Sequence, residues 1–144
     1  LIIAAVAKDS TVNIDKDIQE ALGKIGITAS FVNGDGRQKS YIGIFAPDAE
    51  DINFTNGTND TFSDMKMSVD NYSYDGRKFS VISEGWGIED SLASVKIDGR
   101  EVTNKTRGLH ILVYNKNAHC ATQYLWIDGY DNLNYQDIYL NTVK

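Results

Sequence analysis

Hydrophobic positions near the start of the chain form a continuous run and then recur at helical spacing. Residues 1–7 are all aliphatic, which predicts a strand buried on both faces. Over residues 13–26 the apolar side chains recur every three or four positions, acids occupy the first turn and a glycine ends the segment, so we expect a helix there. The next apolar stretches predict strands at 29–33 and 40–46, joined by an Asn-Gly-Asp-Gly turn at 33–36.

The middle of the chain loses this periodicity. Residues 48–65 are rich in Asp, Asn, Thr and Gly, and predict a long loop that joins the two parts of the chain. The acids of this loop do not have the spacing of a calcium-binding loop, so a solvated loop is favoured over a cation site.

Short alternating segments and tight turns fill the second half. Asp75-Gly76 and Asp98-Gly99 predict hairpin turns, and residues 108–115 are apolar on both faces, which predicts an interior strand. A second, short helix is predicted over residues 131–140. The strands expected in this half are 66–72, 78–83, 93–97, 101–103, 108–115 and 121–128.

These elements predict one domain of the α+β class over residues 1–144, with two packed, mainly antiparallel sheets in a β-sandwich-like arrangement flanked by one or two helices. A chain of 144 residues with 42% hydrophobic side chains can bury a core without a metal or disulfide. No apolar run approaches the roughly 20 residues of a membrane-spanning helix, so we expect no membrane insertion. The chain does not begin with methionine, and we expect it to be part of a longer protein with neighbouring domains.

Charge and cysteine content exclude several classes of site. The net charge of -6 and the scattered Lys and Arg side chains argue against a nucleic-acid partner. A single cysteine, Cys120, excludes an intrachain disulfide and, with only His110 and His119 beside it, a zinc site made of Cys and His alone. Cys120 is interpreted as a buried or half-buried thiol and His110 as an interior histidine. We expect no metal and no cofactor.

No residue pattern indicates catalysis. The acidic pairs Asp128 with Asp131 and Glu89 with Asp90 lack a supporting motif, and the glycines at 34–36 and 85–87 are too closely spaced for a phosphate-binding loop. We therefore expect the protein not to be an enzyme. Low cysteine content, many small polar residues and eight tyrosines favour an extracellular or cell-surface module. Five Asn-x-Ser/Thr triplets are glycosylation acceptors only in a eukaryotic secretory setting.

Two motifs give the chain a family resemblance. Residues 107–115 (RGLHILVYN), followed by residues 125–130 (LWIDGY), resemble the interleukin-like EMT inducer family, also called ILEI/PANDER or GG domains. In that family an Arg-Gly strand is followed by a hairpin and by a strand that closes on Phe-Asp-Thr-Tyr, which corresponds here to residues 127–130 (IDGY). Residues 74–83 and 94–100 resemble the opening hairpins of the family.

The N-terminal segments resemble the same family in a different order. Residues 1–9, 14–26 and 41–44 match pieces that follow the motifs above in the family, so the resemblance implies a circular permutation, or a chain cut out of phase from a repeat array. The permuted halves would be 1–47 and 66–144. A complete single module would bring Leu1 and Lys144 within about 15 Å of each other, with the 48–65 loop exposed, whereas a split module would favour a swapped dimer.

The resemblance also implies a function. Family members include secreted cytokine-like proteins, domains of hyaluronan-degrading surface proteins and a lectin-like stem of a glycosyltransferase; the last implies sugar contacts by Arg107 and Asp128. A third, basic position of that site corresponds to Gly23 and is absent. Sugar rings also need an aromatic face, for which Trp126, Tyr130 or Trp86 are candidates.

The expected function is therefore a non-catalytic recognition or accessory module of a larger surface or secreted protein, with a glycan or cell-surface polysaccharide as its partner. The expected ligand-binding residues are Arg107, Asp128, Trp126 and Tyr130. Two alternatives stay open. Arg107 and Asp128 can form an ion pair that only joins two strands, and the module can be a structural spacer or a protein-interaction domain in a repeat array.

Overall fold

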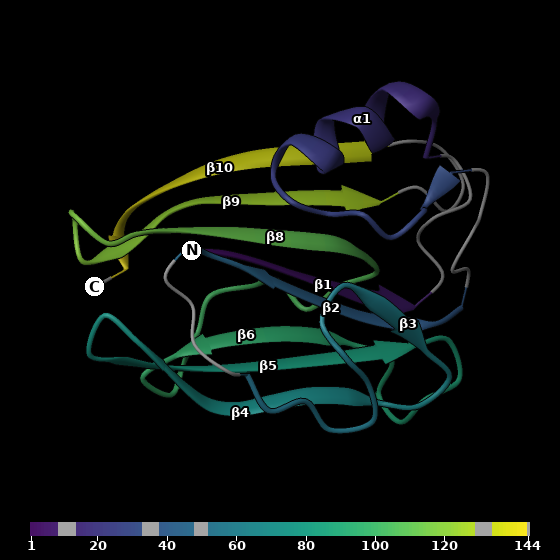
Figure 1. Cartoon of the computed structure of the whole chain (residues 1–144), viewed down its shortest axis with the longest axis horizontal. Helices are drawn as coiled ribbons and strands as arrows, with labels where there is room; N and C mark the ends of the chain where they lie inside the picture. Colours follow the sequence, from purple (N-terminus) through teal and green to yellow (C-terminus); the bar gives the residue numbers. More distant parts are fainter. Residues whose placement is uncertain (9–13, 33–37, 48–51, 129–133, 144) are drawn as a thin grey trace.

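The computed structural model describes residues 1–8, 14–32, 38–47, 52–128 and 134–143, the last range as backbone only. This part of the chain contains one helix and ten strands (Figure 1). In chain order they are β1 (Ile2–Lys8), α1 (Lys16–Lys24), β2 (Ser40–Phe45), β3 (Thr61–Ser63), β4 (Met67–Tyr74), β5 (Arg77–Gly85), β6 (Ala93–Ile97), β7 (Arg100–Glu101), β8 (Gly108–Asn115), β9 (Cys120–Asp128) and β10 (Asn134–Val143).

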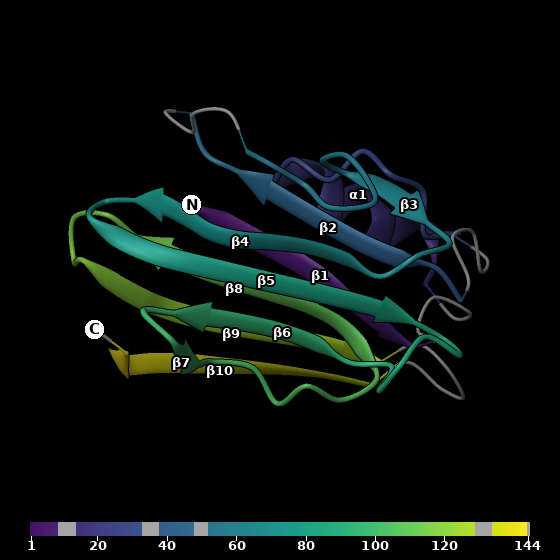
Figure 2. The same ribbon diagram turned by 90° about the horizontal axis from the view of Figure 1, so that it is seen from below.

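The strands are linked by hydrogen bonds into one mixed sheet. The order is β10-β9-β8-β1-β5-β6-β7, with β2 and β3 also joined to β1, and β4 joined to β5. Strands β1 and β5 are parallel and pair only at Ala7 with Glu84 and Lys8 with Gly85. Figures 1 and 2 show that β4, β5 and β6 lie in a layer below β8, β9, β10 and β1, while α1 lies outside the upper layer. The predicted β-rich chain is confirmed, with a single short helix.

Strand β1 is buried on both faces, as its aliphatic run predicts. Alternate residues of a strand point to opposite faces. Ile3, Ala5 and Ala7 face the core between the two layers, which also contains Phe79 and Val81. The other face of β1 packs in a second core under the helix, which comprises Ala4, Val6, Ile14, Leu22, Ile27, Phe31, Tyr41, Leu109, Ile111 and Ile127.

The predicted helix and hairpin turns are confirmed. Helix α1 begins after Asp15, whose side chain accepts a hydrogen bond from the Ile18 backbone N–H at 3.0 Å. Both residues of the turns at 75–76 and 98–99 have positive φ, between 51° and 80°. Such turns match the twist of a hairpin, which is why Asp-Gly is favoured in them.

Residues 29–32 do not form the predicted strand; residue 33 and the turn at 33–36 lie outside the described ranges. The backbone polar groups of residues 29–31 are hydrogen-bonded by a side chain instead of a neighbouring strand. Gln19 donates to the Ala29 carbonyl at 3.0 Å and accepts from the Phe31 N–H at 2.6 Å. The segment thus binds to the preceding helix through Gln19. The alternation of apolar and polar residues does not predict this contact.

The predicted helix over 131–140 is also wrong where the structure describes it. Residues 134–143 form β10, which pairs antiparallel with β9 from Asn134 opposite Asp128 to Val143 opposite Ala121. Tyr, Ile, Thr and Val favour strands, and β9 offers a long edge for pairing. Tertiary pairing therefore decides the structure of a segment with weak helical propensity.

The predicted 48–65 loop contains some strand pairing. Residues 48–51 lie outside the described ranges, but β3 pairs with β2, from Ser40 opposite Ser63 to Ile42 opposite Thr61. Asn59 extends this edge with its side chain, because its amide accepts from the Ile44 N–H at 2.8 Å and donates to the Ile44 carbonyl at 3.1 Å. The loop is thereby fixed along β2.

Asp60 also fixes this loop, and its replacement tests how strongly. Its carboxylate accepts hydrogen bonds from the Thr28 and Ala29 backbone N–H groups at 2.9 and 3.3 Å, and from the Tyr41 hydroxyl. We expect Asp60→Asn to lower the free energy of unfolding by about 2 kcal/mol, because charge-assisted bonds are lost and an amide N–H meets backbone donors. Urea unfolding measures the change.

Asp64→Asn is the matched control for this experiment. The Asp64 carboxylate lies 2.7 Å from Lys39 Nζ, but it is largely exposed, and exposed pairs contribute little. We expect a change below about 0.5 kcal/mol. Equal losses in both variants would contradict a specific role of Asp60.

The described ends of the chain lie at the same end of the upper layer. The Leu1 ammonium donates to the Tyr114 carbonyl at 3.2 Å, Tyr114 is opposite Ala121, and Ala121 is opposite Val143. Three strand spacings of about 4.8 Å put Leu1 and Val143 roughly 14 Å apart. The expected distance of about 15 Å is between Leu1 and Lys144, and Lys144 lies outside the described residues.

Candidate ligand-binding site

Arg107 and Asp128 lie together where β8 begins and β9 ends. Leu109 of β8 pairs with Ile127 of β9. Arg107 lies two residues before Leu109 and Asp128 directly follows Ile127, so the two residues lie side by side. The Arg107 guanidinium binds the carboxylate with two nitrogens: Nε lies 3.1 Å from both oxygens of Asp128, and Nη2 lies 3.0 Å from Oδ2. The structure thus brings together the two residues that the resemblance marks.

The burial of this pair differs from that of a second Arg–Asp pair in the protein. The side chain of Arg107 is 35% exposed and that of Asp128 only 9%. In the other pair the Arg77 side chain is 6% exposed and the Asp98 side chain 48%. A buried carboxylate therefore holds the Arg107 guanidinium at the surface. Arg77 is enclosed instead, and it binds Asp98 and the His119 carbonyl of two other turns.

Trp126 is held beside this pair. Its indole N–H donates to the Arg107 carbonyl at 2.8 Å, and its partly buried ring packs against the inner core. Gly108 allows the contact: its φ is +146°, and a Cβ there would lie 2.7 Å from the Ile127 carbonyl oxygen and overlap the indole. This close approach agrees with the structural role expected of a strand glycine. Tyr130 lies outside the described residues.

His110 is confirmed as an interior histidine. Its side chain is buried, and its Nε2 lies 2.6 Å from the Thr106 carbonyl oxygen. Because a carbonyl only accepts, Nε2 carries the proton and Nδ1 accepts from the Tyr124 hydroxyl at 2.5 Å. Burial lowers the pKa of His110 to about 4, so the ring is neutral at physiological pH. Cys120 is a buried free thiol, as expected.

A second group of charged residues lies at the end of β5. Glu84 is buried, and its Oε2 lies 3.8 Å from Lys66 Nζ, which is 3.2 Å from Glu89 Oε2. Burial raises the pKa of Glu84, and the hydrogen bond from Lys66 lowers the pKa of Glu89. Glu89 and Asp90 are neighbours in the sequence without a supporting motif, and the fold places Glu89 by Lys66, which also faces Glu84. No motif marks Glu84, which lies within an ordinary strand pattern.

A third polar cluster joins two hairpins at the opposite end of the molecule. The Tyr114 hydroxyl donates to Asp75 Oδ2 at 2.7 Å, and His119 Nδ1 lies 2.6 Å from the same oxygen. The hydrogen bond from Tyr114 lowers the pKa of Asp75, while burial raises the pKa of Tyr114 to about 12. These bonds connect the β4–β5 turn to the β8–β9 turn, which is a structural role.

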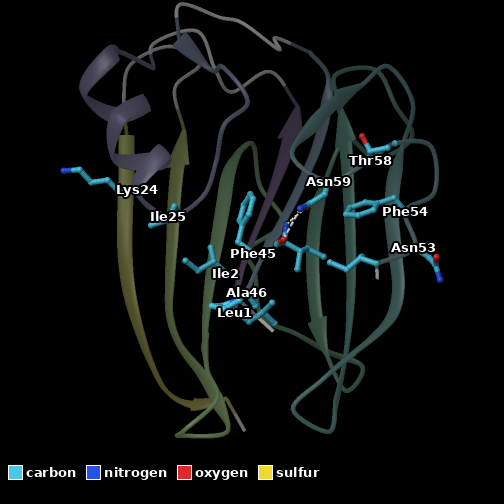
Figure 3. A pocket seen from close by; sticks show the side chains of 14 residues that line it. Leu1, Ile2, Lys24, Ile25, Phe45, Ala46, Asn53, Phe54, Thr58 and Asn59 are labelled. Atoms are coloured by element: carbon cyan, nitrogen blue, oxygen red, sulfur yellow. Dashed lines mark hydrogen bonds between the residues drawn. The ribbon is translucent and has the colours of Figure 1, made fainter. Parts of the chain in front are cut away.

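An open apolar groove of about 1030 Å³ lies between the start of β1, the end of α1 and the end of β2 (Figure 3). Phe45 and Phe54 contribute aromatic side chains, and Asn53, Thr58 and Lys24 contribute polar groups. The lining comes from four separate segments. Sequence patterns did not predict this groove, because each of its residues is an ordinary strand-end or loop residue.

Within the described residues, no three His, Cys, Asp or Glu side chains are placed to hold a metal ion together. The same part of the chain contains no helix with the length and apolar character needed to cross a membrane.

The family resemblance rests on the sequence motifs alone. No protein-family model matches the chain. Comparison with curated proteins found no match either, and comparison with solved structures found none. Membership of the ILEI/PANDER family therefore stays a prediction, carried by residues 107–115 and 125–130.

Proposed function

We propose that this protein is a non-catalytic, lectin-like recognition module that binds carbohydrate through Arg107, Asp128 and Trp126, together with Tyr130. One observation carries the proposal: a buried carboxylate fixes a partly exposed guanidinium beside an indole. Fixed planar donors suit vicinal hydroxyls, and an aromatic ring suits the C–H face of a sugar. Little rotamer entropy is lost on binding, because both side chains are already held.

The proposal places the module in a larger extracellular or cell-surface protein. We further propose a β-sandwich-like, circularly permuted ILEI/PANDER domain, because two layers of strands enclose the inner core and the two described ends lie at one end of the sheet. The partner is a glycan or cell-surface polysaccharide, and no nucleic acid is expected at a net charge of -6.

The second candidate is a structural spacer or protein-interaction domain in a repeat array. The bidentate geometry of Arg107 and Asp128 favours it, because the pair explains the presence of both residues without a ligand. Binding measurements distinguish the two functions, since a spacer has no saccharide affinity.

A glycan array followed by calorimetry with the best saccharide tests the proposed function. We expect Arg107→Ala and Asp128→Ala each to weaken binding by about 1 to 3 kcal/mol, because charge-assisted hydrogen bonds contribute that much. Arg107→Lys should also weaken binding, since lysine keeps the charge but loses the planar fork.

Arg77→Lys is the matched control, because it alters the enclosed Arg–Asp pair. It should lower the melting temperature and leave the saccharide affinity unchanged. Asp128 is buried, so the Arg107 variants also lose stability, and their affinities are measured well below the melting temperature. No binding to any glycan at millimolar concentration would reject the proposal and favour the spacer.

A further inference from the structure

Side chains hold the loop between β7 and β8, which ends with Arg107. Among the described residues, no backbone-to-backbone hydrogen bond reaches residues 103–106 of this loop. Instead, the Asn104 N–H donates to the Tyr124 hydroxyl at 3.3 Å, and Asn104 Oδ1 accepts from the Thr106 N–H and hydroxyl at 3.0 and 2.7 Å. The conformation of the β7–β8 loop therefore depends on a few side-chain groups.

The buried His110 completes this network. Its Nε2 donates to the Thr106 carbonyl at 2.6 Å, and its Nδ1 accepts from the Tyr124 hydroxyl at 2.5 Å. Hydrogen bonds therefore run in a closed ring from His110 through Thr106, Asn104 and Tyr124 back to His110. The His110 and Tyr124 rings are also stacked, with centroids 5.8 Å apart.

His110 and Trp126 fix the two peptide groups on either side of Arg107. The two residues are opposite each other in the pairing of β8 with β9. His110 binds the Thr106 carbonyl, which belongs to the peptide group before Arg107, and the Trp126 indole binds the Arg107 carbonyl, which belongs to the next one. Because peptide groups are planar, holding both of them sets the backbone dihedral angles of Arg107. The guanidinium is thereby directed at Asp128.

Only a neutral His110 ring fits this arrangement. A protonated ring donates from both nitrogens and would have no acceptor for the Tyr124 hydroxyl. The residue is 1% exposed, and burial lowers the pKa of His110 to about 4. Buried polar networks of this kind hold one conformation when every member is bonded, and they are costly when one bond is missing. The ring is therefore suited to keep the β7–β8 loop rigid.

We propose that His110 is a positioning residue of the saccharide site: its neutral ring holds the β7–β8 loop so that Arg107 lies on Asp128 before a sugar binds. Binding then requires no ordering of the loop, which increases the affinity. This inference rests on the proposed function. It adds a buried residue that touches no sugar to the residues on which binding depends.

A first experiment needs no saccharide. The Arg107 Nε–H group gives an NMR signal whose exchange with water is slowed by its bond to Asp128. His110→Leu removes both hydrogen bonds of the ring and keeps the core position apolar. We expect exchange at Arg107 Nε–H and at the Asn104 amide to become about tenfold faster, because the loop opens more often.

Two further variants test the individual bonds. Glutamine keeps an amide N–H that can donate to the Thr106 carbonyl, so His110→Gln should restore most of the slow exchange. Tyr124→Phe removes the hydroxyl that joins Asn104 to His110 and should speed exchange in the same direction as His110→Leu. Tyr124→Phe also tests the proposal if His110→Leu does not fold.

Phe79→Leu is the matched control for a loss of core packing. Phe79 is fully buried in the same inner core, and its ring packs against Tyr114, near the other end of β8 from Arg107. This variant should lower the melting temperature, because a buried ring is replaced by a smaller side chain. The exchange rate of Arg107 Nε–H should stay that of the wild type.

A second experiment measures binding. Each variant is titrated by calorimetry with cellotetraose, mannotetraose and chitotetraose, well below its melting temperature. With the tetrasaccharide that the wild type binds best, we expect His110→Leu to weaken binding roughly three- to tenfold. His110→Gln should weaken it less, and Phe79→Leu should leave it unchanged.

The outcomes separate this inference from the proposed function. Unchanged exchange at Arg107 Nε–H in both His110→Leu and Tyr124→Phe would overturn the inference and leave the proposed function in place. Faster exchange with unchanged affinity would also overturn it, since the loop would then not affect binding. If the wild type binds no saccharide, the proposed function fails, and with it any role of His110 in binding. The exchange rates would then report only how His110 holds Arg107.

Discussion

Replacing Gly85 with alanine should lower the free energy of unfolding by about 3 kcal/mol, at the upper end of the cost of overpacking. Gly85 lies where β1, β2 and β5 meet: it pairs with Lys8, and its N–H donates to Ser40 Oγ at 3.1 Å. A Cβ at this position would overlap the Gln38 carbonyl oxygen and lie 2.8 Å from the Lys39 carbonyl carbon. Both are backbone atoms, so the backbone would have to move where β1, β2 and β5 meet.

Gly23→Ala is the matched control for this prediction. Gly23 lies in α1, and a Cβ there would meet no atom within 4 Å. Alanine favours helices, so this variant should be more stable by about 0.5 to 1 kcal/mol. Chemical unfolding of both variants measures the difference. Unchanged stability of Gly85→Ala would show that the chain is loosely packed where β1, β2 and β5 meet.

Acidification from pH 7 to pH 4 should cost about 3 kcal/mol through His110 alone, because burial lowers its pKa from 6.5 to about 4. Between these two values the unfolded chain binds a proton that the folded protein does not. Stability therefore falls as the pH falls through this window. An NMR titration should show a His110 ring that stays neutral down to about pH 4.

Other groups act in different windows or with the opposite sign. Hydrogen bonds lower the pKa values of Asp75 and Asp98 below 3.8, so their contributions are lost at still lower pH. Burial raises the pKa of Glu84 above 4.5, which favours the folded state at low pH and is lost as the pH rises. Stability curves of Glu84→Gln and His110→Gln separate the two residues. An unchanged pH slope in His110→Gln would contradict the role of His110.

Much of the fold follows from local sequence. The aliphatic run predicts β1, because a strand covered on both faces needs apolar residues at every position. The Asp-Gly pairs predict both hairpin turns, since those residues tolerate the positive φ that the turns require. The capping residue and apolar spacing predict α1 in the same way. Each of these signals lies within a few residues of the element that it predicts.

The errors lie where distant groups compete for the backbone. Residues 29–32 look like a strand, but Gln19 and Asp60 satisfy their N–H and carbonyl groups from other elements. Residues 134–143 have a weak helical pattern, but the edge of β9 makes them a strand. Local propensity is worth only tenths of a kcal/mol per residue, so a paired edge overrides it.

The candidate site shows the same division. By itself the sequence determined a β-rich domain, its central strands and turns, and the motif residues Arg107, Asp128 and Trp126. Only the tertiary structure decided that Asp128 is the buried partner and Arg107 the exposed one, and that Lys66 lies between Glu84 and Glu89. Burial and distance between side chains depend on how strands far apart in sequence pair and pack, and no local pattern encodes those pairings.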